Sequence, residues 1–223
     1  MADRSTNSQF CLGLQTRIEA VYRESGYRLG WRLLCSPPSV LDGASVAFIG
    51  LNPGGAIRRN DHGELAMSRG SAYVDEVWDR ASAAGENPLQ KQIRALFFGL
   101  SLVPEDVLAG NLVPFRSPSW ASLENKDSAL LFGEQLWREI LDRSGPELVI
   151  GMGRELADPL RRILGSPELS KVDVNWGRVK ALKGRFPGGQ LVVLPHLSRF
   201  SIVGRHQSAA AMRALFGDRW NVA

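Results

Sequence analysis

Short apolar runs alternate along this chain with stretches whose apolar residues recur every three or four positions. The runs are bounded by Gly, Pro or Asn, which is typical of buried strands. They cover 46–51 (VAFIGL), 107–113 (VLAGNLV), 148–152 (LVIGM) and 191–194 (LVVL). Helical spacing predicts helices over 89–100, 130–141, 154–164 and 208–216. Because strands that alternate with helices form parallel sheets covered on both faces, the pattern predicts an α/β fold.

Two parts of the chain fall outside this alternation. Before residue 44, the sequence predicts a polar, frayed arm over 1–9, a helix over 10–24 and an extended piece over 27–34. We expect residues 1–43 to form an arm and cap on a main domain of residues 44–223, the two making a single globular unit. Residues 172–186 alternate in type and contain Asn175-Trp176-Gly177, which predicts a small hairpin-like excursion.

Composition excludes several classes of protein. Of 223 residues, 44% are hydrophobic and 22% charged, as in ordinary globular domains. Two cysteines cannot build a disulfide framework, and three scattered histidines show no metal-ligand spacing. We expect no bound metal. No apolar run reaches the roughly 18 residues of a membrane helix, and MADRSTNSQF lacks the apolar segment of a secretory signal. These features predict a cytoplasmic protein that does not bind membranes.

Charge is distributed unevenly. Residues 154–223 hold 12 Lys and Arg against 5 Asp and Glu, whereas the whole chain has a net charge of only +4. The asymmetry predicts a basic face formed by the C-terminal part. Taken alone, however, the uneven charge is better explained as an ordinary solvated surface.

Polar residues follow the predicted strands at the ends where open α/β sheets bind ligands. Asn52 follows the first strand, Asn111 lies inside the second run, and His196 follows the fourth. Asn52 either caps its own turn or holds a water or an amide-like ligand edge. A buried Asn111 either ties two loops together or reads a ligand edge, and the two interpretations are equally supported. His196 is either structural or an acid or hydrogen-bond donor, and the neighbouring Ser198 favours the second reading.

In this order and spacing the strand ends resemble the motifs of the uracil-DNA glycosylase superfamily. Gly50-Leu51-Asn52-Pro53-Gly54 resembles the first motif, and His196-Leu197-Ser198 with Arg199 resembles the second, which is usually His-Pro-Ser. Asn111 is similar in place to the Asn that reads the base. The resemblance covers roughly residues 44–216. It implies a three-layer α/β/α fold with a central four-stranded parallel sheet. It also implies a monofunctional DNA-repair hydrolase that flips a damaged base out of DNA and cuts its N-glycosidic bond without a metal or cofactor. Nothing in the sequence demands more than a monomer.

The resemblance also implies roles for individual residues. Asn52 would position the attacking water and His196 would stabilise the departing base. Asn111 would also bind the base, and Tyr73 would be the aromatic ring that stacks on it. The other base contacts would come from the first motif, namely Gly50, Leu51, Pro53 and Gly54. DNA would be bound by Ser198, Arg199, Phe200 and Arg205.

This sequence departs from the family pattern at three points. Leu197 replaces the usual Pro, which predicts a less rigid second loop. Gly54 stands where strictly uracil-selective members carry a Tyr, which predicts a looser pocket. Two cysteines cannot hold the cluster of the iron–sulfur branches, so we expect a cluster-free protein. We therefore expect a glycosylase acting on uracil or another deaminated base. A catalytically weak or silent DNA-binding relative is the alternative, and an α/β enzyme acting on free nucleotides is a third, weaker reading.

Overall fold

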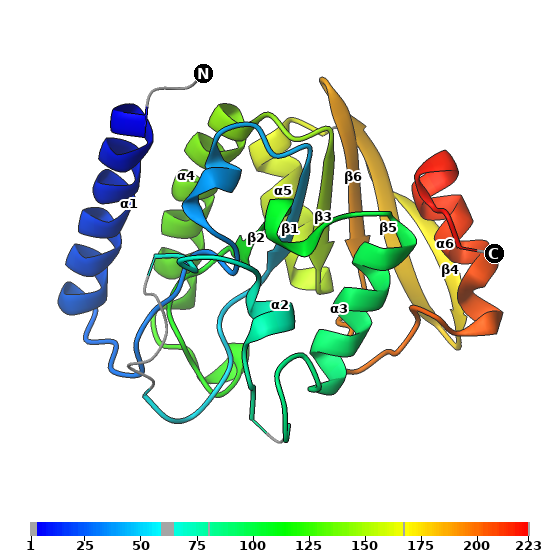
Figure 1. Cartoon of the computed structure of the whole chain (residues 1–223), viewed down its shortest axis with the longest axis horizontal. Coiled ribbons are helices and arrows are strands. Elements are labelled where there is room, and N and C mark those ends of the chain that lie inside the picture. Colours follow the sequence, from blue (N-terminus) through cyan, green and yellow to red (C-terminus); the bar gives the residue numbers. More distant parts are fainter. Residues whose placement is uncertain (1–3, 59–64, 80, 167, 223) are drawn as a thin grey trace.

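The computed structural model describes residues 4–58, 65–79, 81–166 and 168–222, and it confirms an α/β fold. A six-stranded sheet has the strand order β2-β1-β3-β6-β5-β4 (Figure 1). The strands are β1 (Val46–Gly50), β2 (Leu108–Asn111), β3 (Leu148–Met152), β4 (Ser170–Trp176), β5 (Val179–Phe186) and β6 (Gly189–Leu194).

The sheet is mixed, which corrects the prediction of four parallel strands alone. β2, β1, β3 and β6 correspond to the four predicted runs, and they are parallel neighbours. The predicted excursion over 172–186 is a hairpin, but its β5 pairs antiparallel with β6, so both of its strands extend the same sheet. The four-stranded unit is therefore one part of a larger sheet.

Helices cover both faces of this sheet, and alternate residues of each strand point into two separate cores. Ala47 and Ile49 of β1 lie in one core, and Val46 and Phe48 lie in the other. The first core also contains residues of α1 (Arg4–Glu24), α4 (Lys126–Ser144) and α5 (Ala157–Leu164). The second contains residues of α2 (Ala72–Asp75), α3 (Pro88–Gly99) and α6 (Ala209–Phe216).

The helices agree with the predicted ones except near the N-terminus and at α2. The first helix begins at Arg4, so the described residues 4–9 are helical and not a frayed arm. The short α2 was not predicted, because its single turn is too brief to show a helical period. In α3, Asn87 and Gln90 form a reciprocal capping box, which fixes where that helix starts.

The extended segment before residue 36 covers the outer edge of β2. Cys35 N donates to Ala109 O (2.7 Å) and Asn111 N donates to Leu33 O (2.8 Å). A Cβ at Gly110 would lie 2.4 Å from Leu33 O, so only glycine allows this approach. The N-terminal segment thus lies directly beside the end of β2, where Asn111 is placed.

Candidate functional site

The three polar residues predicted at strand ends lie along one edge of the sheet. Gly50 pairs with Asn111 on one side and with Met152 on the other, and Met152 pairs with Leu194. Asn52 lies two residues beyond Gly50, and His196 lies two residues beyond Leu194. The parallel pairing therefore places Asn111, Asn52 and His196 in that order along the carboxyl ends of the strands.

Asn52 is held by its amide nitrogen. Its Nδ2 lies within hydrogen-bond distance of Ser117 Oγ (2.8 Å), Pro53 O (3.2 Å) and Phe115 O (3.3 Å). No described residue donates to its Oδ1, and this oxygen is not fully buried. The carboxamide oxygen is therefore accessible as a hydrogen-bond acceptor at the edge of the sheet.

Asn111 is oriented in the same way, although its residue is only 8% exposed. Its Nδ2 donates to the backbone carbonyl of Arg32 (3.3 Å), and the backbone carbonyl of Asn111 accepts from Trp137 Nε1 (2.7 Å). Because a carbonyl can only accept, the Arg32 contact fixes which end of the amide is the nitrogen. The Oδ1 lies 3.4 Å from where a Cβ of Gly50 would be, and no described residue donates to it. Asn111 therefore both ties two segments together and presents an acceptor.

His196 presents the opposite chemistry. Its Nδ1 accepts from Ser198 N (3.3 Å) and lies 2.8 Å from Ser198 Oγ. With Nδ1 accepting from a backbone N–H, the neutral imidazole carries its proton on Nε2. Burial lowers the pKa of His196, the nearby Arg199 lowers it further, and Glu155 opposes them. The ring is therefore a neutral donor through Nε2 at neutral pH.

The loop that carries His196 is anchored by a buried side chain and by backbone hydrogen bonds. Leu197 is 1% exposed and lies in the core of α3 and α6. Arg199 N and Phe200 N both donate to His196 O, at 2.9 and 3.1 Å. A buried side chain and a tight backbone turn thus hold this loop in place.

Gly153 allows the side chains of Glu155 and His196 to lie close to the end of β3. Gly153, directly after β3, has a φ of 116°. A Cβ there would lie 3.1 Å from Glu155 Oε2 and 3.9 Å from His196 Cδ2. The turn after β3 therefore places Glu155 close to His196. No sequence motif singled out Glu155.

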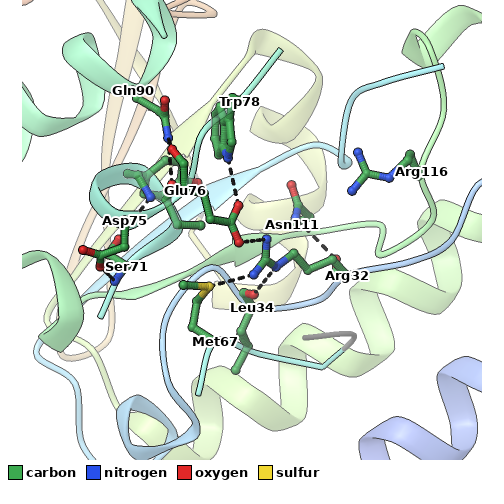
Figure 2. Close-up of polar contacts among 12 residues, drawn as sticks. Arg32, Leu34, Met67, Ser71, Asp75, Glu76, Trp78, Gln90, Asn111 and Arg116 are labelled. Carbon is green, nitrogen blue, oxygen red and sulfur yellow. Dashed lines mark hydrogen bonds and ion pairs between the residues drawn. The ribbon is translucent and has the colours of Figure 1, made fainter. Parts of the chain in front are cut away.

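A buried ion pair behind Asn111 was also missed by sequence reasoning. Arg32 is 3% exposed, and its Nη1 lies 2.7 Å from Glu76 Oε1. The same guanidinium donates to Leu34 O (3.1 Å) and Met67 Sδ (2.8 Å), and Trp78 Nε1 donates to Glu76 Oε2 (2.9 Å). Figure 2 shows this network beside Asn111. The only signal in the sequence was a charged residue inside the apolar stretch 31–35.

The structure corrects the role given to Tyr73. This residue is 3% exposed and lies in α2, and its ring packs edge-on against Phe48, Phe97 and Trp78. A ring enclosed by three aromatic neighbours has no face to stack on a base. Tyr73 is buried because the short helix α2 directs its side chain into the core that contains Phe48 of β1.

The remaining first-motif residues form the turn after β1. Pro53 is buried, Leu51 is half-buried, and Gly54 is exposed. Ser117 N donates to Pro53 O (3.1 Å), and Arg116 Nη1 donates to Gly54 O. Arg116, which Figure 2 places near Asn111, is a further cation at this edge that the sequence did not single out.

The predicted DNA-binding residues lie on the loop after β6, at the same edge. Ser198 and Arg199 are exposed, whereas Phe200 and Arg205 are half-buried against β4. The Phe200 ring meets the Trp176 ring edge-on, with 6.1 Å between centroids. Only part of the C-terminal basic charge lies here. Arg219 pairs with Glu147, which precedes β3 at the opposite end of the strands.

Other kinds of site find no support in the described part of the chain. No cluster of His, Cys, Asp or Glu there could hold a metal ion. None of its helices has both the length and the apolar character needed to cross a membrane. A shallow depression, largely open to solvent, lies between α1 and α4, and its lining includes Phe10, Arg17 and Glu139. It shares no residue with the strand-end site.

Comparison with known proteins adds no assignment to this geometry. No protein-family model matches the chain, and no curated protein matches it significantly.

Proposed function

We propose that this protein is a DNA glycosylase of the uracil-DNA glycosylase type, which removes uracil or another deaminated base from DNA. The observation that carries the proposal is the pairing of chemistries at one sheet edge. Asn52 and Asn111 each present an amide oxygen, and His196 presents a neutral N–H. The parallel order of β2, β1, β3 and β6 supports the proposed three-layer relationship to that superfamily.

The orientation of Asn111 suits a deaminated base. Cytosine and adenine have a bare ring nitrogen on the pairing edge, which accepts a hydrogen bond. Deamination to uracil or hypoxanthine puts a proton on that nitrogen and turns it into a donor. The bond from Nδ2 of Asn111 to Arg32 O orients the amide so that its accessible Oδ1 can accept from such an N–H, and a bare ring nitrogen cannot make this interaction with the oxygen. Intact thymine and guanine also carry this proton, but the cost of flipping a paired base disfavours them.

The proposed reaction is hydrolysis of the bond between C1′ of the sugar and the base nitrogen. The bond breaks with its electron pair leaving on the base, and His196 Nε2–H stabilises the negative charge that develops. Water, held by a hydrogen bond to Asn52 Oδ1, forms the new bond to C1′ and releases its proton to solvent. The base anion takes up a proton, so the products are an abasic sugar and the free base. An amide is a poor base, and Asn52 therefore positions the water instead of deprotonating it.

A base-release assay tests the proposal. Oligonucleotides carrying uracil, hypoxanthine or xanthine, or thymine opposite guanine, are incubated with the purified protein. We expect free base from at least the uracil or hypoxanthine substrate and none from undamaged DNA. Failure to release any base from this panel at high protein concentration would contradict the proposal.

One observation favours the alternative of a silent DNA-binding relative. Asn52 occupies the position where several branches of the superfamily have Asp. Its amide nitrogen already contacts three protein acceptors. Such a protein would bind DNA with a steep dependence on salt and give no product. The same assay, run beside a binding measurement, distinguishes the two functions.

The lowered pKa of His196 predicts a pH dependence of stability. The folded state keeps this ring neutral, whereas the unfolded chain takes up a proton near the ordinary pKa of about 6.5. The unfolding free energy should therefore fall as the pH drops below about 6.5, until the folded-state pKa is reached. His196→Gln should flatten this part of a plot of melting temperature against pH. An unchanged slope in the variant would show that His196 is not the group responsible.

A further inference from the structure

The β4–β5 hairpin reaches the same edge of the sheet as the candidate site. Because β5 is antiparallel to both neighbours, β4 runs in the same direction as β6, and its turn lies at the carboxyl end of β6. Leu182 pairs with Val193, one residue before β6 ends at Leu194. The turn residues Gly177 and Arg178 therefore project beyond β6, beside the loop that carries His196.

The sequence builds this turn with residues suited to its backbone. Asn175 and Gly177 both have positive φ, at 54° and 55°. These are the residue types that adopt this conformation most readily. The pairing register shifts between Asp173 and Trp176, and the resulting bulge increases the local twist near the hairpin tip. Arg178 is exposed at the point of the turn.

Several contacts hold the hairpin tip against the loop after β6. The Arg205 guanidinium stacks 4.8 Å from the Trp176 ring centre, and its Nη1 donates to Asn175 O (2.6 Å). Asn175 Nδ2 in turn donates to Gln207 O (2.7 Å). Together with the edge-on contact of Trp176 and Phe200, these bonds hold the tip and the loop as one surface.

The cations on this surface lack acidic partners. Within the described residues, neither Arg178, Arg199 nor Arg205 forms an ion pair, whereas Lys180 further along the hairpin is paired with Asp173. Positive charges on one surface repel one another, and a bound anion relieves this repulsion. Their planar donors match the oxygen atoms of phosphate.

We propose that the tip of the β4–β5 hairpin is a second phosphate-binding site for DNA, in which Arg178 binds the backbone of the strand that crosses the His196 loop. The inference rests on the proposed function for its choice of DNA as the partner. It adds that the binding surface extends from the loop after β6 onto the hairpin, which joins the parallel strands as an antiparallel pair.

Arg178→Ala tests this site, and Arg185→Ala is its matched control. Both arginines are exposed on β5 or its turn, and both substitutions remove one positive charge. Seven residues separate them, which is about 23 Å along a strand, and Arg185 pairs with Gln190 toward the opposite edge. A general effect of net charge would weaken DNA binding equally in the two variants.

Binding is measured by fluorescence anisotropy on an undamaged duplex of about 20 base pairs, two helical turns, over a range of salt concentrations. Arg178→Ala should weaken binding roughly three- to tenfold at low salt and reduce the slope of log affinity against log salt by about one. Arg185→Ala should match the wild type. With a substrate that is cleaved, Arg178→Ala should raise KM and leave kcat unchanged, because the residue does not touch the reacting atoms.

The outcomes separate this inference from the proposed function. If the wild type binds DNA and Arg178→Ala binds equally well, or if both variants lose affinity to the same extent, the hairpin site is wrong and the glycosylase proposal stands. If the Arg178 effect is seen but no base is released, the hairpin site stands and the glycosylase proposal is wrong. If the wild type binds no DNA at low salt, both are wrong.

Discussion

His196→Ala should reduce the rate of base release by about 10²- to 10³-fold, the usual effect of removing a donor that stabilises developing negative charge. The loss should appear in kcat, because the Nε2–H bond strengthens only as the base becomes anionic. It should also depend on the leaving group. A base with a more acidic N–H, such as 5-fluorouracil, needs less stabilisation and should be released with a smaller loss than uracil. Single-turnover rates on both substrates measure this difference.

His206→Ala is the matched control for that experiment. His206 is exposed at the start of a short 3-10 helix ten residues further along the chain. The same substitution there should leave kcat within about twofold, a change of well under 1 kcal/mol in the barrier. A loss in His196→Ala that is equal for uracil and 5-fluorouracil would contradict leaving-group stabilisation and point to a structural role for the ring.

The parts of the fold that could be predicted are those encoded in local patterns. Each of the four parallel strands lies within, or closely overlaps, an apolar run bounded by turn residues, as for β3 over Leu148–Met152. The hairpin was visible as well, from its alternation and from Asn175-Trp176-Gly177. The pairing of the hairpin with β6 could not be predicted, because alternation of polar and apolar residues does not identify the strand with which a strand pairs.

The candidate site was predictable to the same degree and for the same reason. Asn52 and His196 stood out because the carboxyl ends of parallel strands must meet at one edge. The contacts behind them could not be foreseen. Arg32 and Glu76 are 44 positions apart in the sequence, and no local pattern around either residue predicts their ion pair. Tyr73 was misjudged because a single helical turn decides which way its ring points.

Arg32→Met should lower the unfolding free energy by about 3 to 5 kcal/mol, the cost of breaking a buried ion pair from one side. The Arg32 side chain is 3% exposed and that of Glu76 is 18% exposed, so water compensates the remaining carboxylate poorly. Arg17→Met is the matched control. It breaks an equally short pair with Glu139, but these side chains are 41% and 45% exposed, and the expected loss is below about 1 kcal/mol. Urea unfolding of both variants measures the difference.

Adding Glu76→Gln to Arg32→Met should recover much of the lost stability. The amide removes the unpaired charge while its oxygen still accepts from Trp78 Nε1. Base release by this double variant then separates two roles of the N-terminal segment. Asn111 is oriented by the backbone carbonyl of Arg32 and not by its side chain, so a refolded double variant should keep its preference among bases. If Arg32→Met costs no more than Arg17→Met, the guanidinium is not buried as a charge. The segment would then position Asn111 through its backbone pairing with β2 alone.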